Sequence, residues 1–149
     1  MKIFLLLILI VAIGASLRFY NLDWDQGQMY HPDERAIASA VSRISSSTID
    51  PGFYAYNGLS LYTTKATGYA ASFILQTPLW TTEWTSAIFL GRVLSAFFST
   101  LSLFLLFLIG RHLMGKWGGI LAAALGAVTV GTSYHVALSG DPTPRWQLL

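Results

Sequence analysis

Long runs without a charged residue dominate this chain. Residues 3–17 (IFLLLILIVAIGASL) and 93–110 (VLSAFFSTLSLFLLFLIG) carry no charge, and after Trp117 no formal charge follows until Asp141. Eighteen helical residues rise about 27 Å, close to the ~30 Å hydrocarbon core of a bilayer. Charged residues make up 11% of the sequence, against about 25% in soluble domains. We therefore predict an all-α integral membrane protein.

The charges that flank these runs predict an orientation. Arg111, His112 and Lys116 crowd the short turn between the second and third runs, which the positive-inside rule assigns to the cytoplasm. The N-terminus is then also cytoplasmic, and the first loop lies outside. The expected order is a transmembrane helix (1–20), an outer loop with juxtamembrane helices (21–91), a second (92–113) and a third (117–138) transmembrane helix, and an irregular C-terminal stub (139–149).

Two segments allow more than one interpretation. Lys2 followed by an apolar run and Gly14-Ala15-Ser16 is also typical of a cleaved signal peptide, although the later runs favour a retained anchor. Residues 59–79 are long enough to cross a membrane but contain Lys65 and several threonines. Because residue 92 must lie outside in this topology, we expect that segment to be an amphipathic or re-entrant helix on the outer face.

The loop after the first run holds four of the seven acids of the chain, and the pair Asp33 and Glu34 follows Pro32. Proline suits the first turn of a helix, and carboxylates suit its positive end. Ile37, Val41 and Ile44 recur at helical spacing, which predicts a short amphipathic helix lying flat on lipid. The acids either complement the helix end or hold two carboxylates at headgroup depth for chemistry.

His31, His135 and Asp141 are further candidates for a functional site. His31 with the two following acids suggests metal ligands, but neighbouring helical side chains point about 100° apart, which makes a shared ion unfavourable. His135 and Asp141 emerge at the outer end of the last run. They either cap and turn the chain there or share the outer face with Asp33, where polar groups at membrane depth are functional candidates.

The stretches RFYNLDWDQGQMYHPDERAI and, further along the chain, DPGFYAYNGLSLY are similar to the beginning and the later part of the first outer loop of the GT-C glycosyltransferases. GRVLSAFFSTLSLFLLFLIGRHLMGKWGGILAAALGAV resembles the hairpin that follows, and SYHVALSGD the stretch that ends it. The family is typified by protein O-mannosyltransferases and the lipid A aminoarabinose transferase.

The resemblance implies an inverting transfer of a sugar from a polyprenyl or dolichyl phosphate to a hydroxyl of a protein, lipid or glycan. The reaction would take place on the non-cytoplasmic side of a bacterial or archaeal plasma membrane. The resemblance also implies catalytic roles for Asp33 and Glu34, with Asp33 as the general base. Substrate-binding roles would fall to His31, Arg92, His135 and Asp141. The resemblance implies no definite cofactor and leaves open a divalent metal ion. A carboxylate partly desolvated at the interface is also a stronger base than a free one.

The sequence departs from the family pattern in two ways. Asp141 follows His135 by six residues, one more than the usual spacing, and PTPRWQLL lacks the next apolar span. We therefore expect an N-terminal fragment that is inactive alone. The alternatives are a small non-enzymatic membrane subunit or scaffold and, less favoured because the spans hold no acids, a transporter fragment. The net charge of +2 is too small and scattered to predict nucleic-acid binding, and the absence of cysteine excludes thiolate metal sites.

Overall fold

A computed structural model describes residues 2–26, 30–55, 58–78 and 83–129. Within these ranges 79% of the residues are helical and no strand occurs, which confirms the all-α prediction. The chain divides into two compact units, one formed by residues 1–20 and 96–149 and the other by residues 21–95. Each unit is described by itself below.

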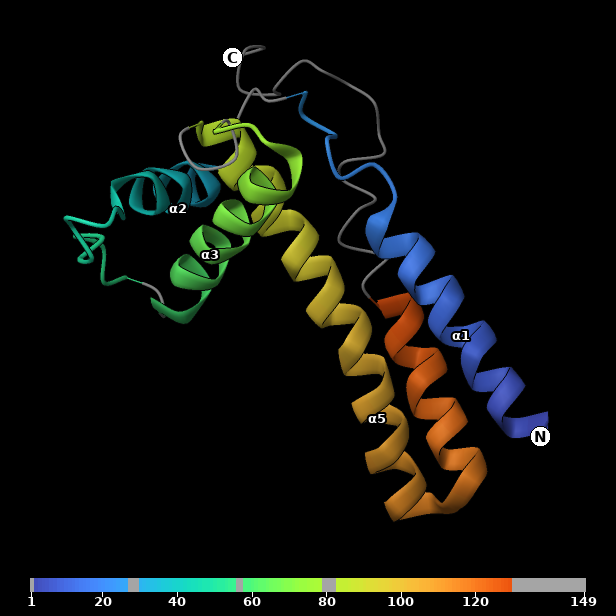
Figure 1. The fold of residues 1–149 in the computed structure, drawn as a ribbon. Helices are drawn as coiled ribbons and strands as arrows, with labels where there is room; N and C mark the ends of the chain where they lie inside the picture. The colour runs from blue at the N-terminus through green and yellow to red at the C-terminus, as the bar shows by residue number, and fades with distance from the viewer. Residues whose placement is uncertain (1, 27–29, 56–57, 79–82, 130–149) are drawn as a thin grey trace, which may run out of the picture. The chain divides into compact units, whose positions relative to one another are not determined.

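The first unit packs α1 (Lys2–Phe19) beside the larger part of α5 (Trp84–Thr129), as Figure 1 shows. Gly115 interrupts α5 with φ 76° and ψ −171°, a backbone conformation that glycine adopts without strain. The helix therefore folds back on itself at the basic turn. We name residues 84–114 the first arm and residues 116–129 the second arm.

The third apolar run contains four glycines of the kind that close helix packing in lipid uses, Gly118, Gly119, Gly126 and Gly131. In the described part of the run, small residues let the two arms approach closely. A Cβ atom on Gly119 would lie 2.7 Å from the carbonyl oxygen of Phe107, and one on Gly110 would lie 2.8 Å from that of Gly118. The fourth glycine named for this role, Gly131, lies outside the described residues. The buried centre of the unit is apolar and consists of Leu7, Phe107, Ile120 and Ala123.

Among the described residues, two helices, α1 and α5, are long and apolar enough to cross a membrane, and the most apolar 18-residue window of each has a mean hydropathy of 2.3. Their exposure favours lipid contact, since 17% and 22% of their most apolar windows are buried and large side chains such as Phe4 and Leu9 are more than half exposed. The predicted span 1–20 corresponds to α1, and 92–113 lies within the first arm. The third span, 117–138, stays a prediction, because the described part of the second arm ends at Thr129.

Arg18, near the end of α1, forms hydrogen bonds to both arms of α5 in the first unit. It is 1% exposed, and its guanidinium donates to Ser99 Oγ on the first arm at 2.8 Å. It also donates to the carbonyl oxygens of Gly126 at 2.9 Å and Ala127 at 3.3 Å on the second arm. These bonds explain how a charged side chain is tolerated inside an otherwise apolar bundle.

The second unit contains α2 (Pro32–Arg43), α3 (Gly58–Leu75) and the start of α5. As predicted, α2 begins at Pro32. The face that was expected to lie on lipid is instead buried in protein: Val41 and Ile44 are 4% and 6% exposed and pack in one cluster with Leu61 of α3 and Ile88 of α5. The apolar stripe is a real helix face, but its periodicity cannot distinguish a lipid surface from a neighbouring helix.

The segment predicted at 59–79 forms α3, and it is not one of the two helices apolar enough to span a membrane. Its buried residues include Thr64 and Lys65 as well as Leu61. The Lys65 Nζ lies 5.5 Å from the ring centroid of Tyr69, and burial lowers the pKa of this lysine. The burial of Thr64 and Lys65 fits a helix that packs against protein within the loop.

Candidate functional site

Arg92, on the first arm of α5, forms the centre of an ion cluster within the second unit. Its Nη1 and Nη2 donate to the two carboxylate oxygens of Asp25 at 2.9 and 2.8 Å. Its Nε and Nη2 donate to the two carboxylate oxygens of Glu34 at 2.9 and 2.7 Å. The remaining Nη1 hydrogen is directed to the Leu22 carbonyl oxygen at 2.8 Å. All five N–H donors of the guanidinium are thereby used.

The cluster is largely shielded from solvent. The side chains of Arg92 and Asp25 are 10% and 1% exposed, whereas that of Glu34 is 27% exposed. The Arg92 guanidinium also lies over the Trp24 ring, 5.4 Å from its centroid, within the range of a cation–π interaction. Bidentate pairing on two sides fixes the orientation of both carboxylates. We call Asp25, Glu34 and Arg92 the arginine triad.

The two acids of the predicted catalytic pair have different surroundings. Glu34 belongs to the arginine triad, where Arg92 contacts both of its oxygens. Asp33 is exposed in the first turn of α2 and is not part of the triad. Successive helical residues point about 100° apart, so Glu34 can contact Arg92 while the adjacent Asp33 stays exposed. The pair therefore consists of one held carboxylate and one accessible carboxylate.

The other predicted site residues are only partly brought together. His31 is exposed at the N-cap of α2, where its side chain makes no capping hydrogen bond, and its carbonyl oxygen accepts from the backbone N–H of Arg35 at 3.3 Å. Arg92 is central, as described above. His135 and Asp141 lie outside the described residues. Among the residues that are described, no group of three or more His, Cys, Asp or Glu could hold a metal ion.

The sequence interpretation did not identify Asp25, the most buried carboxylate of the triad, as a site residue. The available signal was its position beside Trp24 in an acid-rich loop, ahead of an apolar run that begins directly after an arginine. A buried charge needs a paired charge, and Arg92 is the cation that opens the second apolar run. The sequence pattern does not show how the loop folds so that Asp25 meets Arg92, 67 positions further along the chain.

Comparison of the chain with protein-family models, with curated proteins and with solved structures gives no match in any of the three. The functional interpretation therefore rests on the residues themselves and on the geometry given above.

Proposed function

We propose that this chain is the N-terminal part of a membrane glycosyltransferase of the GT-C type, which transfers a sugar from a lipid-phosphate carrier to an acceptor hydroxyl on the non-cytoplasmic side. The observation that carries the proposal is the division of the acidic pair: Asp33 is exposed at the start of α2, and the adjacent Glu34 is fixed by Arg92. An accessible base on a rigidly held helix end is the arrangement that the reaction needs.

In the proposed reaction Asp33 accepts the proton of the acceptor hydroxyl as its oxygen attacks the anomeric carbon. The new glycosidic bond forms while the bond from that carbon to the phosphate oxygen breaks. The electron pair leaves with the lipid phosphate, and the configuration of the anomeric carbon inverts because attack and departure occur on opposite faces. His31, exposed one residue before α2, would contribute to substrate binding beside this base.

The triad changes the roles proposed for two residues. Glu34 becomes a positioning residue, because both of its oxygens accept hydrogen bonds from Arg92. Arg92, proposed from the sequence to bind substrate, already directs all five of its donors to protein oxygens. A donor phosphate would have to displace Asp25 or Glu34 to reach it. We therefore propose that Arg92 orients the end of α2 rather than holding the phosphate.

The experiment measures sugar transfer from a panel of radiolabelled polyprenyl-phosphate sugars to membrane acceptors, using membranes that contain the product of the complete reading frame. Asp33→Asn should lower the transfer rate by about 10²–10⁴-fold, the usual contribution of a general base. Asp23→Asn is the matched control, since Asp23 is another exposed carboxylate of the same loop, and it should leave the rate unchanged. An Asp33→Asn enzyme as fast as the Asp23→Asn enzyme would remove Asp33 from the base role.

The second candidate is a non-enzymatic membrane subunit or scaffold, and one observation favours it. The arginine triad is saturated by its own contacts, as expected of a structural anchor that fixes a loop against a helix. Under this alternative, no donor in the panel supports transfer, and Arg92 variants alter stability without any effect on chemistry. Transfer that depends on Asp33 would exclude it.

A further inference from the structure

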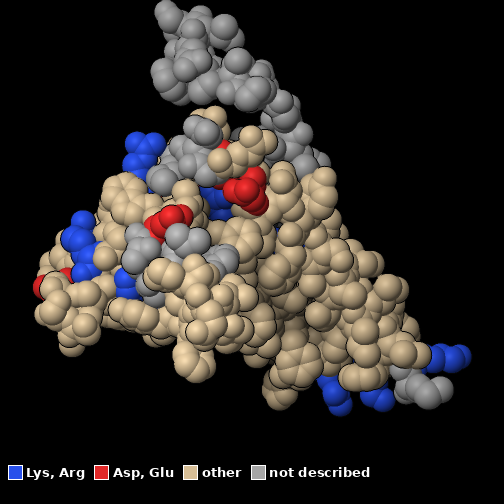
Figure 2. Space-filling model, turned by 45° about the horizontal axis from the view of Figure 1, so that its top comes forward, with Lys and Arg blue, Asp and Glu red and all other residues tan. Residues whose placement is uncertain are grey.

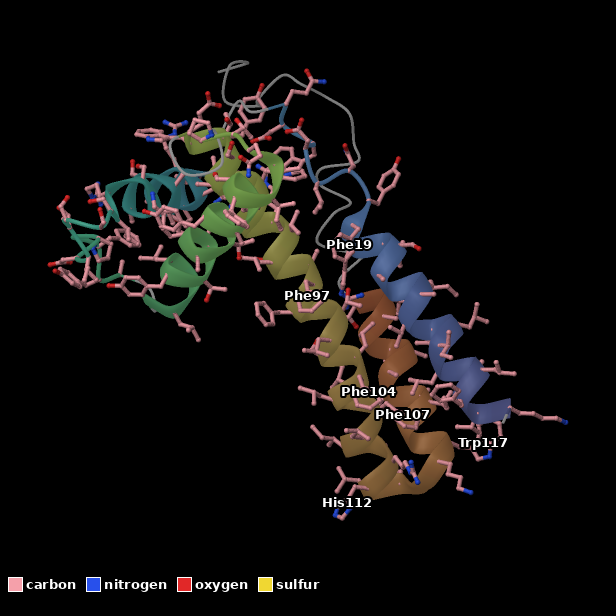
Figure 3. All side chains as sticks on the ribbon, viewed as in Figure 1. Phe19, Phe97, Phe104, Phe107, His112 and Trp117 are labelled. Carbon is pink, nitrogen blue, oxygen red and sulfur yellow. The ribbon has the colours of Figure 1, made fainter. Side chains whose placement is uncertain are left out.

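The first unit contains a cavity that the proposed transfer reaction does not use. It has a volume of about 620 Å³ and lies between the start of α1 and the parts of α5 that flank Gly115. Its wall is apolar and includes Leu7, Phe104 and Phe107. The two phenylalanine rings are stacked, with centroids 6.5 Å apart and planes 29° apart. Figure 3 shows Phe104 and Phe107 on the first arm, with His112 near the end of the same arm and Trp117 at the start of the second.

Three cations line the same cavity: Lys2, Arg111 and Lys116. All three are exposed, so their charged ends can reach water and headgroups. The described residues of this unit, 2–20 and 96–129, contain no Asp or Glu. Figure 2 agrees, since Lys and Arg side chains gather at this end of the unit with no acidic side chain beside them on the face shown. The charge at the cavity mouth is thus not balanced by acids from the same part of the chain.

We infer that this cavity binds an anionic phospholipid of the surrounding bilayer. Its phosphate and any further headgroup charge would lie among Lys2, Arg111 and Lys116, and part of an acyl chain would lie against Phe104 and Phe107. Basic pockets between membrane helices are suited to anionic headgroups, and an apolar cavity wall favours an alkyl chain over water. A soluble anion would match the cations but leave the apolar wall in contact with water.

Trp117 supports a location at the membrane interface. It is 70% exposed and directly follows Gly115 and Lys116, and tryptophans are enriched at headgroup depth, where their amphipathic rings fit. A lipid bound there would connect the N-terminal turn of α1 to the hairpin turn of α5. The inference does not depend on glycosyl transfer, because none of these residues belongs to the acidic loop or to the arginine triad.

The test uses the whole chain in lipid nanodiscs of phosphatidylcholine doped with phosphatidylglycerol of the same acyl chains, and native mass spectrometry measures which lipid remains bound. The unmodified chain should retain phosphatidylglycerol preferentially. Arg111→Gln should weaken that retention about fivefold, since one basic residue near an anionic lipid contributes about 1 kcal/mol and 1.4 kcal/mol is tenfold. Adding Lys2→Gln and Lys116→Gln should weaken it by about a hundredfold.

Two controls separate this site from general attraction by positive charge. Arg111→Lys keeps the charge and should retain the lipid, while Arg35→Gln removes one exposed charge from the second unit and should also retain it. Soluble glycerol phosphate carries the headgroup chemistry without acyl chains and should not compete at equal concentration. Equal retention by Arg111→Gln and the unmodified chain, equal losses in Arg111→Gln and Arg35→Gln, or full competition by glycerol phosphate would each overturn the inference.

Discussion

Replacing Arg92 with methionine tests whether the arginine triad holds the second unit together. Methionine keeps a long, flexible apolar side chain but removes all five donors. Asp25, with a side chain 1% exposed, would then lose both of its bonds from the guanidinium. Glu34 would lose both of its bonds as well, but it is 27% exposed and water can replace part of what is lost.

The expected loss in the free energy of unfolding follows from this difference in burial. Removing one partner of a buried ion pair costs about 3–5 kcal/mol, and the Asp25 side of the triad belongs to this class. The partly exposed Glu34 side adds at most about 1 kcal/mol because solvent screens it. The Trp24 contact adds about 0.5–1 kcal/mol. We therefore expect Arg92→Met to destabilise the unit by about 5 kcal/mol and Glu34→Gln by about 1 kcal/mol or less.

The assay is reversible unfolding of the whole chain in mixed micelles with increasing SDS, followed by far-UV circular dichroism. Arg92→Lys keeps the charge but loses the planar fork, so its loss should be intermediate. Glu83→Gln changes an exposed side chain of the same unit and should change stability by no more than about 0.5 kcal/mol. If Arg92→Met unfolded at the same SDS fraction as Glu83→Gln, the triad would not be a stabilising contact and the assignment of Arg92 as an orienting residue would be wrong.

Three further predictions concern other parts of the chain. Arg18→Met should destabilise the first unit by about 2 kcal/mol in the same SDS assay, because three interhelical hydrogen bonds are lost at about 0.6 kcal/mol each in a membrane; an unchanged midpoint would contradict this. Gly119→Ala should destabilise by about 1–3 kcal/mol through overpacking against a backbone oxygen 2.7 Å away, whereas Gly91→Ala, with nothing within 4 Å of the new Cβ, should be neutral or stabilising; equal effects would refute the packing argument. The hydroxyl of Tyr54 donates to Asp50 and is the main cause that lowers the pKa of this carboxyl, so the contact stabilises the loop above the ordinary pKa of an aspartate and is lost as pH falls through the lowered value. Tyr54→Phe should raise the Asp50 pKa in an NMR titration, and an unchanged value would show that the hydroxyl is not responsible.

The sequence by itself determined the helices and the class of the fold. Uninterrupted apolar runs of about 18 residues are typical of a helix that satisfies its own backbone groups away from water, and the boundary of α2 at Pro32 follows from the fixed φ of proline. The turn at Gly115 was also readable, because a basic, glycine-containing stretch separates two apolar runs. These features are local, and local features are encoded in neighbouring residues.

The tertiary structure alone decided which side chains meet. The face with Val41 and Ile44 was expected on lipid, yet α3 and α5 cover it, because an apolar stripe is equally stabilised by either surface. Asp33 and Glu34 are adjacent in sequence, but their separation into an accessible acid and an Arg92-bound acid depends on a partner 58 positions away. Pairings over such distances depend on how the loop folds back onto the start of α5, and local sequence patterns such as periodicity and capping do not reveal that geometry.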